Sequence, residues 1–282
     1  MREGPRSRKL RSAFISAFSR AAGLIAGNRL VLKAYEWFLL GAVRKGRAVP
    51  EHIGVILDGN RRWASSRGLE PWEGHREGAK KVEDFLGWCL EFDGIRAITL
   101  YVLSTENFKR PREELEKLLE ITKEYFERAA SDERIHKHRV RIKAIGRLDM
   151  LPEDVREAIR KAEEATKDYG DRYLNIAIAY GGRAEIVDAV RKAVRDVLDG
   201  RLSPDQLDER AIEERLYTSY LPNPYPDLII RTSGEERLSN FLLWQSAYSE
   251  LCFMDVYWPS FRKIDLLRAI RLYQQRSRRF GA

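Results

Sequence analysis

The first candidate chemistry lies where an apolar segment changes abruptly into a cluster of polar residues. Residues 53–57 read IGVIL, which is typical of a buried strand. A carboxylate, a glycine, an amide and two cations follow directly: Asp58, Gly59, Asn60, Arg61 and Arg62. Mg²⁺ needs only one or two protein carboxylates plus phosphate oxygens, and the arginine fork binds two phosphate oxygens at once. The stretch therefore predicts a site for a metal and a phosphorylated ligand.

Three more predicted strands end in the same way. Their polar ends read STENFKR over 104–110, YGGR over 180–183 and RTSGEER over 231–237. Because the carboxyl ends of parallel strands lie on one edge of a sheet, where ligands bind, we expect these turns to converge into one site. That site would pool two carboxylates with six arginines: Asp58, Glu250, Arg61, Arg62, Arg110, Arg183, Arg231 and Arg237. A single arginine reads equally well as a solvated turn residue, but the whole set favours a ligand with one or two diphosphates.

The common nucleotide-binding signatures are missing from the sequence. There is no GxxxxGKS or GxxxxGKT loop, and no GxGxxG follows the first strand. An aspartyl phosphatase is also disfavoured, because Asn60 stands where a second acid would be expected. His75 has no Ser or Cys partner in a recognisable frame, so no nucleophile–base pair is predicted. A metal-bridged diphosphate needs no protein nucleophile when the departing carbon is allylic, because the resulting cation is stabilised by resonance.

The composition is that of a soluble globular protein with anionic partners. The chain has 282 residues, of which 44% are hydrophobic and 33% charged, and a formal net charge of +8. This charge suits nucleic acid, an acidic membrane surface or a phosphorylated substrate, and does not choose among them. Cys89 and Cys252 lie in apolar segments, which predicts reduced thiols in a cytoplasmic protein without a disulfide or a zinc site.

Strand-like and helix-like segments alternate after a basic linker at 44–50. Strands are predicted at 53–58, 95–104, 140–146, 173–182 and 227–234. Helices are predicted from about 77, at 111–129 with acids near its start, at 153–167, at 183–200, and from about 263. The alternation predicts an α/β fold with a mostly parallel central sheet flanked by helices.

Residues 1–44 are predicted to form a basic and amphipathic helical extension, ahead of a catalytic domain at 45–282. Residues 24–43 alternate apolar faces with charges, as an amphipathic helix would. Two interpretations stay open: the helix packs on its own domain, or it lies on an anionic membrane. The membrane-facing side chains would be Leu30, Tyr35, Trp37, Phe38 and Leu39. No run of about 18 uncharged apolar residues occurs, so no membrane-spanning helix is predicted.

Five segments resemble, in order, the signature regions of the cis-prenyltransferases, the undecaprenyl and dehydrodolichyl diphosphate synthase family. They read HIGVILDGNRRWA, EGHREGAKKV, ITLYVLSTENFKRP, LNIAIAYGGRAEI and LIIRTSGEERLSNFLLWQSAYSEL. The resemblance covers about 50–281 and implies the family fold, with a hydrophobic product tunnel. It also implies a Mg²⁺-dependent transferase that adds isopentenyl diphosphate units to an allylic starter, farnesyl or geranylgeranyl diphosphate. The product would be a long-chain polyprenyl diphosphate, the precursor of a glycosyl carrier lipid.

The resemblance implies roles for individual residues. Asp58 would hold Mg²⁺, and Glu250 would complete the metal site. Glu250 could come from the same chain or from the partner subunit's side of the pocket. The allylic diphosphate would be held by Gly59, Asn60, Arg61, Arg62, Trp63, His75 and Arg110. The diphosphate of isopentenyl diphosphate would be held by Arg231, Arg237 and Ser239. Asn107 would lie near the reacting centre with Asp58 and His75, although an amide is not itself a base.

Some of these residues also have simpler interpretations, and some positions differ from the family pattern. His75 also fits a polar residue in the first turn of a helix, and Ser239 also fits a helix N-cap. Arg61 matches eukaryotic- and archaeal-type members, since bacterial members usually carry glycine there. Pro71 stands where the family tends to carry arginine, so one phosphate contact is missing or comes from Arg67 or Arg76.

The product would need an apolar tunnel. Candidate lining residues are Phe85, Leu86, Trp88, Leu90, Leu115, Leu118, Leu119, Phe126, Val102, Leu103 and Ile142, which read equally well as ordinary core. The ending resembles the family's Arg-x-Gly element at 279–281, which reaches the active site across a dimer interface, so a homodimer is predicted. A non-catalytic partner subunit is the alternative, and it would be expected to lack Asp58 or the arginines. Nucleic acid is not predicted as a partner, because the cations cluster at strand ends rather than on exposed aromatic platforms.

Overall fold

The computed structural model describes residues 29–46 and 48–276. In these ranges six strands form one sheet in the order β3-β4-β2-β1-β5-β6, and every neighbouring pair is parallel. The strands are β1 His52–Ile56, β2 Ala97–Ser104, β3 Val140–Ile145, β4 Arg172–Tyr180, β5 Leu228–Arg231 and β6 Glu250–Phe253. The predicted parallel sheet is confirmed. β1 and β5 are buried along their whole length, because helices and loops cover both faces of a parallel sheet.

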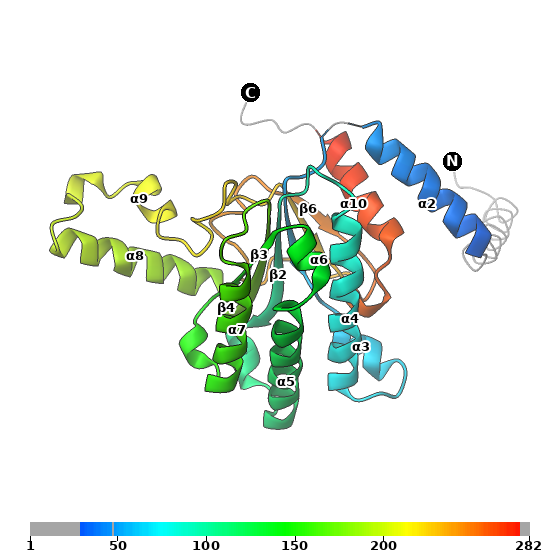
Figure 1. Ribbon diagram of the computed structural model, residues 1–282, viewed down its shortest axis with the longest axis horizontal. Coiled ribbons are helices and arrows are strands. Elements are labelled where there is room, and N and C mark those ends of the chain that lie inside the picture. The colour runs from blue at the N-terminus through cyan, green and yellow to red at the C-terminus, as the bar shows by residue number, and fades with distance from the viewer. Residues whose placement is uncertain (1–28, 47, 277–282) are drawn as a thin grey trace, which may run out of the picture.

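Helices flank the sheet. They are α2 Arg29–Arg44, α3 Asn60–Ser65, α4 Pro71–Cys89, α5 Arg112–Ala129, α6 Glu133–Lys137, α7 Glu153–Thr166, α8 Gly182–Leu198, α9 Glu209–Glu213 and α10 Lys263–Gln275. Figure 1 shows α4, α5 and α7 in front of the sheet, and α2 outermost beyond α10. In the same view α8 and α9 extend away from the sheet as an arm.

Five elements differ from the prediction. The helix expected from about residue 77 begins at Pro71, because Glu70 and Glu73 form a capping box and proline occupies the first turn. β6 was not predicted, since four residues that begin with a charge show no periodicity. The short helices α3, α6 and α9 were also missed.

The helix α2 packs on its own domain, which is one of the two interpretations of the N-terminal segment. Leu39 and Val43 are buried in the main core, where α2 packs against α10. The expectation that Leu39 faces a membrane is therefore wrong. Trp37 and Phe38 are 78% and 63% exposed. Residues 24–28 of the predicted helix lie outside the described residues, and no described helix is long and apolar enough to cross a membrane.

Candidate active site

Polar residues from three of the four expected strand ends meet around one cavity. Ile56 of β1 lies in register with Tyr101 of β2 and Arg231 of β5. The cavity has a volume of about 870 Å³, and its lining includes Asp58, Asn107 and Arg231. Among the described lining residues, none comes from the turn after β4, so the expected fourth contribution is missing.

Asp58 and Arg231 form an ion pair at the head of this cavity. Arg231 Nη2 donates to Asp58 Oδ2 at 2.8 Å, and the Arg231 side chain is 4% exposed. A second guanidinium, that of Arg62, lies 3.6 Å from Asp58 Oδ1. Burial alone would raise the pKa of Asp58, but the hydrogen bond and charge of Arg231 outweigh it and lower the pKa. Asp58 is therefore ionised at neutral pH.

The donor set around Asp58 fits Mg²⁺. Within the described ranges no cluster of three or more His, Cys, Asp or Glu could hold a metal without other ligands. Mg²⁺ does not need such a cluster, because waters and substrate phosphates supply most of its ligands. Asp58 lines the cavity beside the guanidinium groups of Arg61, Arg62 and Arg231, which suit those phosphates.

Gly59 and Asn60 turn the chain from β1 into α3. Gly59 has a φ of 102°, and a Cβ atom there would lie 2.7 Å from the Tyr257 ring. Only glycine satisfies both conditions. The Asn60 amide donates to the Leu57 carbonyl at 2.9 Å, and its Oδ1 atom is buried against Gly78 without a partner among the described residues. The structure thus gives Asn60 a packing contact with α4, while its contact with diphosphate stays a prediction.

Glu114 joins three residues of the site, although the sequence analysis did not assign it a role. Its side chain is 5% exposed, and Oε1 lies 3.0 Å from Arg110, 3.4 Å from His75 and 3.5 Å from Arg61. Acids near the start of a helix were read only as favourable to its N-terminus. The spacing of four residues from Arg110 is the signal that could have identified the pair.

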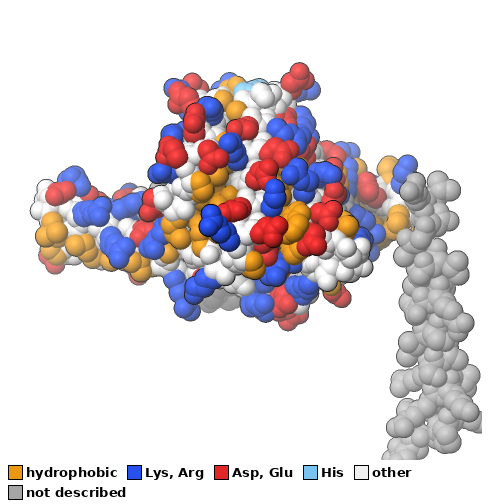
Figure 2. Space-filling model, turned by 90° about the horizontal axis from the view of Figure 1, so that it is seen from below, with side chains coloured by type: hydrophobic (Ala, Val, Ile, Leu, Met, Phe, Trp, Pro, Cys, Tyr) orange, Lys and Arg blue, Asp and Glu red, His pale blue; other side chains and the backbone are white. Residues whose placement is uncertain are grey.

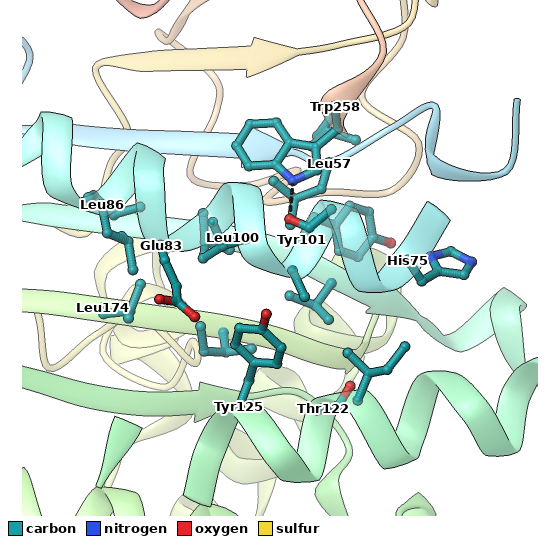
Figure 3. Close-up of a pocket in the computed structure, with 18 of the residues that line it drawn as sticks. Leu57, His75, Glu83, Leu86, Leu100, Tyr101, Thr122, Tyr125, Leu174 and Trp258 are labelled. Atoms are coloured by element: carbon teal, nitrogen blue, oxygen red, sulfur yellow. Dashed lines mark hydrogen bonds between the residues drawn. The ribbon is translucent and has the colours of Figure 1, made fainter. Parts of the chain in front are cut away.

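His75 lies in this cluster and is neutral. Burial and the charge of Arg110 lower its pKa to about 4, against the opposing hydrogen bond with Glu114. Figure 3 shows His75 at the head of the cavity, on the opposite side from Leu86 and Glu83. A neutral imidazole contacts a diphosphate as a hydrogen-bond partner rather than as a cation.

Of the residues expected to hold isopentenyl diphosphate, Arg231 ends β5, and its side chain contacts the following loop at Arg237 and Ser239. Arg231 Nη1 donates to the Ser239 hydroxyl at 2.7 Å and also to the Arg237 carbonyl. The Arg237 side chain pairs with Glu235 at 2.5 Å and does not line the cavity. No described helix begins at Ser239, whose φ is 46°, so the N-cap interpretation is wrong.

The side chains of Asn107 and Trp63 each make a hydrogen bond within the protein. Asn107 lies in the 3₁₀ helix η1 (Thr105–Lys109), where its Oδ1 accepts the Ser104 backbone N–H at 2.9 Å. It lines the cavity, but this oxygen is already bound. Trp63 donates to the Ser260 hydroxyl at 2.9 Å and does not line the cavity.

Three further arginines do not line the cavity: Arg67, Arg76 and Arg183. The Arg67 guanidinium lies over the Trp63 ring at 4.1 Å, and Arg76 pairs with Glu124 at 3.2 Å. Neither candidate for the missing contact at Pro71 therefore faces the site, whereas Arg61 and Arg110 do.

Glu250 does not lie with Asp58 in this chain. It begins β6 and is in register with Leu228, at the amino ends of β5 and β6. Asp58 follows the carboxyl end of β1, so the two carboxylates belong to opposite edges of the sheet. Glu250 instead pairs with Arg276 at 2.7 Å. The expectation that one chain pools both carboxylates is wrong, and a shared metal site across two subunits stays a prediction.

The apolar part of the cavity runs between α4, α5 and the sheet (Figure 3). Of the expected tunnel residues, Leu86, Leu90, Val102, Leu118, Phe126 and Ile142 line it. The others belong to the surrounding packing and do not line it: Phe85, Trp88, Leu103, Leu115 and Leu119. Helical spacing alone could not separate the two groups, because neighbouring residues of one apolar stripe point partly into the cavity and partly into the core.

An ionised carboxylate among arginines, at the head of an apolar cavity, fits the class of enzymes that act on diphosphates of hydrophobic chains. The chain belongs to the undecaprenyl diphosphate synthase family of prenyltransferases, since the family model described as "Putative undecaprenyl diphosphate synthase" matches residues 56–281. The predicted family and enzyme class are confirmed.

Similar proteins agree with this assignment. A tritrans,polycis-undecaprenyl-diphosphate synthase (geranylgeranyl-diphosphate specific) of Methanopyrus kandleri is 61% identical over 89% of this chain and 91% of its own. The protein of the same name from Thermococcus kodakarensis is 54% identical over 89% of this chain and 94% of its own. Among solved structures, lavandulyl diphosphate synthase from Lavandula x intermedia, in complex with dimethylallyl diphosphate, has a TM-score of 0.79. It is 36% identical and covers 83% of this chain and 99% of that one.

Proposed function

We propose that this enzyme adds isopentenyl diphosphate units to geranylgeranyl diphosphate and makes a long-chain polyprenyl diphosphate, the precursor of a glycosyl carrier lipid. One observation carries the proposal: a single cavity joins the charged head at Asp58 to an apolar body between α4 and α5. The names of the relatives support geranylgeranyl diphosphate as the starter. Farnesyl diphosphate is the starter against which this choice is tested.

The head of the cavity offers two places for a diphosphate. Arg61 and Arg110, held by Glu114, suit the diphosphate of the allylic starter. Arg231 and Ser239, joined at 2.7 Å, suit that of isopentenyl diphosphate. The allylic C–O bond breaks, and its electron pair leaves with the diphosphate. The double bond of isopentenyl diphosphate attacks the allylic carbon, and the cation that forms loses a proton from C2 of the isopentenyl unit to the released diphosphate, which forms the new double bond.

Asp58 would hold Mg²⁺ at this head. When bound, the ion neutralises the negative charge that develops on the leaving diphosphate. Arg231 keeps Asp58 ionised, which a metal ligand requires. Asn107 offers its amide N–H groups to a substrate, because its oxygen accepts the Ser104 backbone N–H. It therefore orients a substrate or a water molecule and does not remove a proton.

The same proposal includes a homodimer. Val187, Val190, Val194 and Leu198 are exposed and follow one face of α8 at helical spacing. Figure 2 shows hydrophobic side chains along this arm. Burying them against a second copy would remove an apolar row from water. Glu250 could contribute to a metal site with Asp58 only if a second copy supplied it. The predicted Arg-x-Gly contact at 279–281 lies outside the described residues.

Peripheral membrane contact completes the proposal. A long polyprenyl product is insoluble in water, and α2 exposes Trp37 and Phe38 beside the cations Lys33 and Arg44. Aromatic side chains next to lysine and arginine suit the interface of an anionic membrane.

The deciding experiment is incubation with labelled isopentenyl diphosphate, Mg²⁺ and each of geranyl, farnesyl and geranylgeranyl diphosphate, followed by sizing of the products. We expect elongation to be fastest with geranylgeranyl diphosphate. Equal or faster elongation of farnesyl diphosphate would refute the starter preference alone. A folded protein that elongates no starter would refute the enzyme and favour the non-catalytic subunit.

A further inference from the structure

The turn after β4 does not line the cavity, but it holds a loop that does. This loop, residues 232–240, follows β5 and contributes Ser239 to the lining. At its end, the Asn240 backbone carbonyl accepts the Gly182 N–H at 2.7 Å, and the Asn240 side-chain Oδ1 accepts the Arg183 N–H at 2.9 Å. Gly182 and Arg183 are the first two residues of α8. The first N–H groups of a helix have no partner within it, so Asn240 caps α8 from a distant part of the chain.

A third hydrogen bond joins Asn240 to the segment after β2. Asn240 Nδ2 donates to Glu106 Oε1 at 3.2 Å. Glu106 lies in η1 beside Asn107, which lines the cavity, whereas Asn240 and Glu106 do not. Asn240 therefore connects three strand ends: its own loop after β5, the turn after β4, and η1 after β2.

Two glycines make room for this contact. A Cβ atom at Gly181 would lie 2.7 Å from Asn240 Nδ2, and one at Gly182 would lie 3.1 Å from the Asn240 carbonyl oxygen. Gly181 stands at the N-cap position of α8 and has no side chain with which to cap the helix itself. The turn after β4 thus offers Asn240 both the space and the unpaired N–H groups that it binds.

The loop needs such support because two consecutive residues have a left-handed backbone. The φ angles of Ser239 and Asn240 are 46° and 67°. Asparagine adopts this conformation more readily than most residues, but serine does not. Such a conformation persists only where surrounding contacts fix it. The three hydrogen bonds of Asn240 follow directly after Ser239, whose hydroxyl accepts from Arg231 at 2.7 Å.

We propose that Asn240 is a positioning residue for isopentenyl diphosphate: it fastens the 232–240 loop to α8, so that the Ser239 hydroxyl and Arg231 stay together at the head of the cavity. The inference rests on the proposed function, which assigns this diphosphate to Arg231 and Ser239. The allylic diphosphate is assigned to Arg61 and Arg110, which Glu114 holds instead. Loss of the Asn240 side chain should therefore weaken the binding of one substrate and not of the other.

The test compares the KM values of Asn240→Gly for the two substrates. Glycine keeps the left-handed backbone and the carbonyl that accepts the Gly182 N–H, but it removes both side-chain hydrogen bonds. We expect KM for isopentenyl diphosphate to rise about tenfold, a factor within reach of two lost hydrogen bonds. KM for geranylgeranyl diphosphate should stay within about twofold. A merely structural role would reduce the amount of active enzyme and leave both KM values unchanged, and that result would overturn the inference. An equal rise in both values would overturn it too.

An exchange of groups between Asn240 and Glu106 supplies a rescue. Asn240→Asp keeps an acceptor for the Arg183 N–H, but it places a second carboxylate beside Glu106, so KM for isopentenyl diphosphate should again rise. Adding Glu106→Gln supplies an amide that donates to the new carboxylate, and KM should return to within about threefold of the unaltered protein. A double variant no better than Asn240→Asp alone would contradict the proposed role. This pair keeps the test decisive if Asn240→Gly does not fold.

Asp208 provides the matched control. It caps α9 by accepting the Ala211 N–H at 2.8 Å, and it does not line the cavity. Asp208→Gly therefore removes a helix cap away from the site and should leave both KM values unchanged. A rise in KM for isopentenyl diphosphate in this variant would overturn the inference, because the loss of any cap would then suffice. Absence of elongation by the unaltered protein would instead overturn the proposed function, and the inference with it.

Discussion

The neighbour that contributes most to lowering the pKa of Asp58 is Arg231, which is buried. Arg231 is almost inaccessible to water, so its positive charge depends on Asp58 and on the Ser239 loop for compensation. Removing one partner of a buried ion pair leaves an uncompensated charge, which costs stability as well as function. A substitution at Asp58 must therefore preserve shape and hydrogen bonding if it is to report on chemistry alone.

Asp58→Asn meets this requirement better than Asp58→Ala. We expect Asp58→Asn to fold and to lower turnover at least about 100-fold, because a neutral amide binds Mg²⁺ poorly and leaves the leaving diphosphate without charge neutralisation. Asp58→Ala should lose stability in addition. Steady-state kinetics with labelled isopentenyl diphosphate, alongside thermal unfolding, separates the two effects. Asp84→Asn, on the exposed side of α4, is the control. Turnover within about twofold of the unaltered protein would remove Asp58 from the mechanism.

At the scale of elements, the contact between α3 and α4 positions the head of the cavity. Gly74 and Gly78 lie one turn apart on α4, and Cβ atoms there would each come within 2.2 Å of an Asn60 oxygen. The two glycines allow Asn60, and with it the turn that follows Asp58, to lie directly against the helix. Gly87, on the same helix, has open space where its Cβ would be.

These glycines give a paired prediction for stability. Gly78→Ala should lower the free energy of unfolding by about 1–3 kcal/mol, because Asn60 must move and its buried position is overpacked. Gly87→Ala should raise it by about 0.4–1 kcal/mol, since alanine restricts the unfolded chain without a clash. Urea unfolding followed by circular dichroism measures both. A Gly78→Ala protein as stable as Gly87→Ala would show that the α3–α4 contact is not tight.

For the whole molecule, the arm formed by α8 and α9 is the part least explained by the packing of a single chain. The exposed valines of α8 face away from the sheet, and Glu250 lies at the sheet edge opposite Asp58. Both observations are accounted for if a second copy covers α8 and contributes to the site.

Val194→Lys should therefore convert the proposed dimer into a monomer. A charge in the centre of the α8 row opposes its burial, so the sedimentation coefficient at micromolar concentration should fall to that of one chain. Met150→Lys, at an exposed apolar residue outside α8, should leave the dimer intact. A sedimentation coefficient unchanged by Val194→Lys would place the interface elsewhere, and a monomeric unaltered protein would refute the dimer.

The proposed contact with membranes is also tested on the whole molecule. The unaltered protein should sediment with vesicles containing phosphatidylglycerol, and less with vesicles of phosphatidylcholine alone, because cations flank the exposed aromatics of α2. Trp37→Ala combined with Phe38→Ala should reduce this binding at least about tenfold. Leu207→Ala, an exposed apolar residue elsewhere, serves as the control. Equal binding by the double variant would exclude α2 as the contact.

Much of the architecture could be predicted because strand and helix periodicities are local. Apolar runs followed by polar turns identified β1, β2 and β5. Because parallel strands share one direction, the proximity of Asp58 and Arg231 could also be predicted. β6, α3, α6 and α9 were missed because each is too short to show a period. The five ordered segments identified the family because their order and residue types are written in the chain itself.

Sequence alone determined that a carboxylate, an amide and several arginines would gather at one edge of a parallel sheet, because residue types and strand direction suffice for that. The tertiary structure decided which of them face the cavity, since burial, register and helix rotation depend on contacts distant along the chain. It placed Glu114 among Arg61, His75 and Arg110, and it put Glu250 at the opposite edge. It also showed which apolar residues of a single helix line the cavity and which are buried in the core, because this depends on how the helix packs against the sheet.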